Sequence, residues 1–133
     1  MLTRYLIPAT LLVAAIIHLL PVSGVLGAEQ LQRLYGLPLA EPNLVLLMRH
    51  RAVLFGLLGA FLLIAAFQPT LRTLAFAFGL VSVVSFFLLV PEGAARTPQI
   101  ARVVAADWVA FGALVLGFAL HSFERRRAPG AAR

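Results

Sequence analysis

The chain has 133 residues, of which 62% are apolar and 12% are charged, and its formal net charge is +6. Soluble domains carry roughly 25% charged residues, so half that share excludes an ordinary water-soluble globule. The sequence contains no cysteine, which excludes disulfides, thiolate metal sites and thiol redox chemistry.

Four long apolar runs dominate the chain, at residues 5–22, 44–67, 71–90 and 100–122. Each is long enough to cross ~30 Å of hydrocarbon as a helix. Because backbone groups in lipid need internal partners, helices are the predicted form. We therefore expect an all-α, membrane-embedded four-helix bundle that forms one domain over residues 1–133. The first run also has features of a signal peptide, but its apolar stretch is longer than a signal core, so we expect it to be retained.

The longest connection, residues 23–43, follows the first run and contains its own helical pattern. Within it, residues 28–35 place apolar side chains on one side and a Glu29/Arg33 pair on the other, and Gly36 follows. This pattern predicts a short helix that lies in the membrane interface and covers the outer end of the bundle. An ordinary surface helix that anchors the loop is an equally good interpretation.

Prolines mark the ends of the second span. Pro42, with Glu41 before it, is typical of a first helical turn that has an acid at its N-terminus. Pro69 cannot continue a helix, so residues 68–70 predict a tight antiparallel hairpin between the second and third spans.

Arginine positions predict the orientation, because positive charge favours the cytoplasmic side. With both termini inside, the cytoplasmic segments hold Arg4, Arg72, Arg125, Arg126, Arg127 and Arg133, and the opposite loops hold Arg33 and Arg96. We therefore expect a bacterial inner-membrane protein with both termini in the cytoplasm. Its basic tail, residues 123–133, is expected to contact anionic lipid headgroups, with no role in binding nucleic acid.

Small residues predict where the helices meet, because apolar burial does not drive helix association in lipid. The expected seams contain Ala52, Gly56, Ala60, Ala75, Gly79, Ala106, Ala110, Ala113 and Gly117.

Polar side chains of all four spans fall in the same outer third of the predicted bundle. These residues are His18, Arg49, His50, Arg51, Ser85, Arg102 and Asp107. Ionisable groups inside a span are costly unless paired or wetted, so this cluster is the predicted polar network or ligand site.

Partners within this cluster can be predicted. Buried Asp107 needs a cation, and Arg49 or Arg51 is the expected one. Two residues apart on a helix, these arginines point in different directions, so only one faces the bundle centre. The other is expected to reach the headgroups or to pair with Glu41 or Glu92.

Two aromatic features belong to the same prediction. His50 is expected to interact with His18 as a titratable partner. Trp108, next to Asp107, is expected to form an aromatic wall of the pocket.

Three interpretations of the cluster remain open. It locks the helices together, as in a structural or assembly subunit of a larger membrane complex. Alternatively, it binds a lipid-like or quinone-like hydrophobic molecule, with an arginine on the head and Asp107 and His50 available for proton transfer. In the third, His18 and His50 are axial ligands of a haem. The sequence requires no cofactor, and homo-oligomerisation is also open.

Three stretches resemble a family of small, functionally uncharacterised bacterial four-helix membrane proteins. They are the LYG at residues 34–36, the LMRHRAVLFG at 47–56 and the ARVVAAD at 101–107. The four-span layout with an external LYGL-type loop is also similar to the broader DoxX-like group, some of whose members are tied to quinone or sulfur redox chemistry.

Similar chains often carry the name phosphopantetheine adenylyltransferase, which the residues do not support. That enzyme is a soluble nucleotide-binding α/β protein with an HxGH-type motif, whereas here His18 is followed by Leu19, Leu20 and Pro21. The chain also has no phosphate-cradling glycine loop, HExxH or dinucleotide fingerprint. We therefore favour binding over catalysis and leave enzymatic activity open.

Overall fold

The computed structural model describes residues 2–90, 93 and 95–127, and none of these residues lies in a strand. The long helices are α1 (Thr3–Leu19), α3 (Pro42–Phe67), α4 (Arg72–Leu89) and α5 (Pro98–Arg127). A short helix, α2 (Ala28–Tyr35), lies between the first two. The predicted all-α bundle with a short helix between its first two spans is therefore confirmed.

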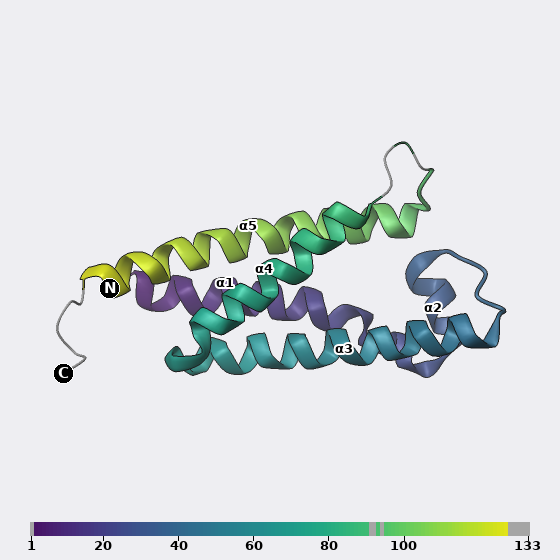
Figure 1. Ribbon diagram of the computed structural model, residues 1–133, viewed down its shortest axis with the longest axis horizontal. Helices are drawn as coiled ribbons and strands as arrows, with labels where there is room; N and C mark the ends of the chain where they lie inside the picture. Colours follow the sequence, from purple (N-terminus) through teal and green to yellow (C-terminus); the bar gives the residue numbers. More distant parts are fainter. Residues whose placement is uncertain (1, 91–92, 94, 128–133) are drawn as a thin grey trace.

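The four long helices lie around a common core. Helix α1 packs against α3 and α5, and α4 packs against the same two helices from the other side. Both described ends of the chain lie at one end of the bundle, and α2 lies at the other (Figure 1). Helix α4 begins beside the end of α3 and diverges from it, running obliquely to α5 as it approaches the α2 end (Figure 1).

Four segments of the chain are long and apolar enough to cross a membrane. The outer surface of the bundle agrees with this, because large apolar side chains on it are widely exposed, such as Ile16 at 60%, Leu57 at 63% and Val81 at 66%. In water such a surface would be unfavourable, whereas lipid solvates it. The chain is thus a multi-pass membrane protein.

The first span does not continue as one α-helix. Helix α1 ends at Leu19 and is followed by a 3₁₀ helix, η1 (Leu20–Leu26). Pro21 has no N–H to donate to the carbonyl four residues earlier, so one bond of the α-helical ladder is missing where α1 gives way to η1. Beyond η1, Gly27 at φ 127° lets the chain turn into α2.

Helix ends follow the predicted signals. Gly36 closes α2 in the left-handed conformation at φ 67°. Glu41 caps α3, accepting hydrogen bonds from the backbone N–H groups of Asn43 at 2.9 Å and Leu44 at 2.6 Å. These bonds favour the charged carboxylate and lower the pKa of Glu41 below its ordinary value. At the far end, the 3₁₀ turn η2 (Pro69–Leu71) makes the predicted hairpin between α3 and α4.

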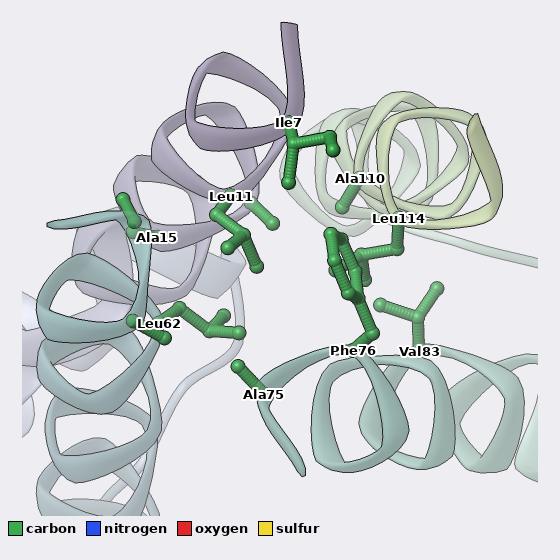
Figure 2. Packing of buried hydrophobic residues seen from close by; sticks show 12 residues of the cluster. Ile7, Leu11, Ala15, Leu62, Ala75, Phe76, Val83, Ala110 and Leu114 are labelled. Atoms are coloured by element: carbon green, nitrogen blue, oxygen red, sulfur yellow. The ribbon is translucent and has the colours of Figure 1, made fainter. Parts of the chain in front are cut away.

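The core lies between all four long helices, and α3 contributes Leu62, Ala65 and Ala66 to it. Phe76 and Val83 of α4 point toward Ala110 and Leu114 of α5 (Figure 2). All four side chains are at most 1% exposed. Close approach there depends on Gly117 of α5, because an added Cβ would lie 2.6 Å from the Phe76 ring and would also overlap the Thr10 hydroxyl.

We predict that Gly117→Ala destabilises the bundle. The buried Phe76 ring has no room to move, so the cost should be about 1–3 kcal/mol, as for other overpacked cores. The control is Gly112→Ala on the same helix, where an added Cβ meets nothing within 4 Å. It should be neutral or stabilising by up to ~1 kcal/mol. Thermal unfolding in detergent measures both variants, and equal midpoints for the two would contradict this packing.

Candidate ligand-binding site beneath α2

A cavity of about 350 Å³ lies beneath α2, between α1, α3 and α5. We call it the α2 cavity. Its lining residues are Ile17, Leu20, Pro21, Arg33, Leu34, Tyr35, Arg51, Phe55, Gln99, Arg102, Val103, Ala106 and Asp107. None of the described residues of α4 is among them, in agreement with the divergence of α4 from α3 at this end (Figure 1). The cavity therefore has apolar walls and a small group of polar side chains, the usual composition of a small-molecule site.

Three of the predicted site residues meet in this cavity, namely Arg51, Arg102 and Asp107. Arg51 and Asp107 each lie nine residues into their helices, which is roughly 14 Å along the axis at 1.5 Å per residue. Both helices start at the α2 end of the bundle (Figure 1), so equal distances along them correspond to a similar depth. Arg51 and Asp107 thus lie at a similar depth, and Arg102 lines the same cavity nearer the α2 end.

Arg51 is held in a fixed position by aromatic groups. Its Nη1 donates a hydrogen bond to the Tyr35 hydroxyl over 2.8 Å, which connects α3 to α2. The guanidinium carbon lies 4.5 Å from the centre of the Phe55 ring and 5.5 Å from that of Tyr35. Such cation–π contacts gain strength where water is excluded. Of the two candidate arginines, Arg51 is thus the one that faces the bundle centre.

Asp107 lines the same cavity without a direct partner. Its side chain is 8% exposed, and the structure gives its carboxylate no hydrogen bond and no basic nitrogen within 4.0 Å from the described residues. The predicted ion pair of Asp107 with Arg49 or Arg51 is therefore not formed. Arg51 is engaged by Tyr35 and Phe55 instead, and Asp107 is left facing the cavity. A buried carboxylate in this state is the feature that most needs a ligand.

His18 lies behind the cavity wall. It is 1% exposed, and its ring stacks on Phe55 with centroids 5.7 Å apart. Its Nδ1 bonds to the Ala14 carbonyl over 2.8 Å, and because a carbonyl only accepts, Nδ1 carries the proton. Nε2 then accepts from the Ser82 hydroxyl at 3.3 Å. A continuous series of contacts therefore runs from the cavity to α4, through Arg51, Phe55, His18 and Ser82.

Three predicted site residues lie elsewhere. Arg49 is exposed, and its Nε donates to the Val25 carbonyl over 2.8 Å, so its expected pairing with Glu41 is wrong. Its other expected partner, Glu92, lies outside the described residues. His50 is also exposed. The hydroxyl of Ser85 donates to the Ser82 carbonyl of its own helix, a local bond typical of serine in helices.

The two histidines are not brought together. His18 is buried with both ring nitrogens engaged, whereas His50 is exposed and does not line the α2 cavity. Neighbouring helical positions differ by ~100°, so once Arg51 faces the cavity, His50 points away from it. This arrangement does not favour paired axial ligands for a haem.

Trp108 does not form the expected wall of the cavity. It is 58% exposed and stacks on Phe87 of α4, with centroids 4.4 Å apart. The adjacent position Asp107 faces inward, and the helical rotation between neighbours takes Trp108 to the outer surface. The aromatic wall is supplied by Phe55 and Tyr35 instead.

Helix α2 is tied to the start of α5 by Thr97. The Thr97 hydroxyl donates to the Tyr35 carbonyl over 2.6 Å and accepts from the Ile100 N–H over 3.2 Å. One side chain thus caps α5 and fixes the end of α2 over the cavity. A small apolar cluster of Leu31, Tyr35 and Leu39 supports the same contact.

Sequence reasoning missed four residues that shape the site, and three of them left a signal. Phe55 lies four residues after Arg51 and so shares its helix face. Thr97 precedes Pro98, a pairing typical of an N-cap followed by a first helical position. Tyr35 lies on the apolar side of α2, where its hydroxyl still reaches a polar group. Gln99, the fourth, carried no signal beyond its place near the helix start.

Comparison of the chain with protein-family models, with curated proteins and with solved structures finds no match. The resemblance to DoxX-like and other small bacterial four-helix membrane proteins therefore stays a prediction.

We predict that Thr97→Val loosens α2. Valine keeps the shape but removes both hydrogen bonds, each worth about 1 kcal/mol. Amide hydrogen exchange in residues 29–36 should then accelerate about fivefold or more. Thr97→Ser retains the hydroxyl and is the matched control, which should exchange as the unchanged protein does. Unaltered exchange in the valine variant would show that Thr97 does not hold α2.

Proposed function

We propose that this protein binds a polar-headed apolar molecule, of the lipid or quinone class, in the α2 cavity. The single observation that supports this most is Asp107, a nearly buried carboxylate that faces a cavity holding arginines and makes no hydrogen bond to the described residues. A purely structural network would be expected to satisfy such a group internally. An incoming ligand can do so instead.

The walls of the cavity support an apolar body for this ligand. Ile17, Leu20, Val103 and Ala106 contribute aliphatic surface, and Phe55 contributes an aromatic face. A volume of about 350 Å³ is at the lower end of ligand sites, which run from roughly 300 to 1,000 Å³. Such a cavity accommodates a headgroup or a ring, with the remaining apolar part extending into the bilayer.

The function proposed is binding, without an assigned reaction. None of the described residues forms a cluster of three or more His, Cys, Asp or Glu that could hold a metal ion. Within the cavity, Asp107 and Tyr35 are the side chains of the described lining with an ordinary proton-transfer role. We place the protein in the bacterial inner membrane, with the α2 end outside and the termini in the cytoplasm, on the basis of the arginine distribution.

Filling the cavity tests the binding proposal. Ala106→Phe places a ring in the α2 cavity, so the amount of bound lipid or quinone, measured by mass spectrometry of the purified protein, should fall at least fivefold. Ala105→Phe adds the same ring at an adjacent exposed position and should leave the bound amount unchanged. If no such molecule accompanies the unaltered protein and a stoichiometric partner protein is recovered instead, the assembly-subunit interpretation replaces the proposal.

Orientation has its own test. Because the chain has no cysteine, single cysteines can be introduced at exposed positions near the two ends of the bundle, Gln32→Cys on α2 and Arg126→Cys on α5. A membrane-impermeant maleimide should label Gln32→Cys on intact spheroplasts and Arg126→Cys only after permeabilisation. The reverse pattern would invert the proposed topology.

A further inference from the structure

The charges that face the α2 cavity are of both signs and are not matched to each other. Asp107 supplies a carboxylate with no hydrogen-bonding partner among the described residues. Arg102 is exposed at the cavity, and its guanidinium makes no hydrogen bond to the described part of the chain. By contrast, Arg51 is bound to Tyr35, and Arg33 forms an ion pair with Glu29 at 2.5 Å. Asp107 and Arg102 are therefore the anion and the cation of the cavity that have no hydrogen-bonding partner among the described residues.

This pairing distinguishes between headgroup chemistries. A simple anionic head would bind Arg102 but would leave Asp107 unpaired and would be repelled by it. A quinone carbonyl accepts hydrogen bonds and has none to give to a carboxylate. A trimethylated ammonium neutralises the carboxylate but lacks N–H donors. A primary ammonium linked to a phosphate satisfies both protein groups with charge-assisted hydrogen bonds.

On these grounds, and resting on the proposed function, we propose that the α2 cavity binds the zwitterionic phosphoethanolamine head of an aminophospholipid. Its ammonium donates to Asp107, and its phosphate accepts from Arg102. The cavity thus selects a primary amine at its buried end and a phosphate at its exposed end.

The depths of the two residues match the order of groups in such a lipid. Asp107 is nearly buried, whereas Arg102 is exposed and lies five residues earlier in α5, about 7.5 Å nearer the α2 end. The ammonium is the free tip of the head, so it enters furthest, and the phosphate follows. The acyl chains attached beyond the phosphate then remain outside the bundle.

The surface beside the cavity suits those chains. Helix α4 diverges from α3 at this end, and none of its described residues lines the cavity (Figure 1). Exposed aliphatic side chains lie on both helices, including Leu54 on α3 at 51% and Leu88 on α4 at 80%. A lipid head can therefore enter from the side while its chains stay against apolar surface.

Native mass spectrometry of the full chain tests the selection. The protein in detergent is titrated with phosphatidylethanolamine, phosphatidylcholine and phosphatidylglycerol of identical acyl chains, and separately with free phosphoethanolamine. We expect phosphatidylethanolamine to bind about tenfold more tightly than either other lipid, the value of one charge-assisted hydrogen bond. Free phosphoethanolamine should bind far more weakly, because it lacks chains. If it binds as well as the lipid does, the source is a soluble amine phosphate and the lipid assignment is overturned.

Two variants separate the roles of the charges. Asp107→Asn should abolish the preference for phosphatidylethanolamine over phosphatidylcholine while phosphatidylglycerol binding persists, which also shows that the variant is folded. Arg102→Gln should weaken phosphatidylethanolamine and phosphatidylglycerol alike. The control Glu124→Gln removes an acid at the opposite end of the bundle and should change nothing.

The outcomes also separate this inference from the proposed function. Equal binding of the three lipids, or an unchanged preference in Asp107→Asn, overturns the aminophospholipid assignment and leaves a less selective lipid site. Binding of a quinone in place of any phospholipid also overturns the aminophospholipid assignment, and it leaves the proposed binding function in place. Failure of every lipid and quinone to bind overturns both.

Discussion

The close approach of helices at glycine is the constraint on which the rest of this structure depends. Gly117 admits the Phe76 ring between α4 and α5, and Gly59 accepts Leu19 where α1 crosses α3. In a bilayer, lipid tails solvate apolar surface as well as a neighbouring helix does, so contact must come from packing at short range. Toward the α2 end, α4 diverges from α3 (Figure 1). The α2 cavity lies at this end of the bundle, between α1, α3 and α5.

Polar and aromatic groups hold α2 in place over the cavity. Thr97 fixes α2 to α5, and Arg51 reaches from α3 to the Tyr35 hydroxyl. Few residues of α2 otherwise touch the long helices, which leaves its position dependent on a handful of directional bonds. An element held in this way can open at modest cost, because each such bond contributes about 1 kcal/mol net. The same bonds that complete the site therefore also permit access to it.

Much of the fold could be predicted from the sequence because lipid leaves few alternatives. Apolar runs of spanning length had to be helices, Pro69 had to end one, and Gly36 was suited to closing α2. The small-residue seam of α3 shows the limit. We predicted Ala52, Gly56 and Ala60, but Ala60 is exposed and Gly59 carries the close contact. A spacing of four identifies a face of a helix, but the crossing point depends on the partner's side chains, and the sequence pattern does not contain them.

The sequence predicts how deep each candidate residue lies along its helix, but only partly which side of the helix it occupies. Because helical rise is regular, the sequence predicts which residues lie at a similar level, and Arg51, Arg102 and Asp107 line one cavity. Direction is set by rotation about each axis, and here it depends on which arginine finds an aromatic partner. Phe55 stacks on His18 and receives Arg51, so the rotation of α3 places Arg49 and His50 on the outside. The same contacts hold the Arg51 guanidinium beyond salt-bridge distance of Asp107. A charge that the protein could have paired internally thus stays open to the cavity, and this is the reason we propose a binding site where the sequence alone also allows a structural ion pair.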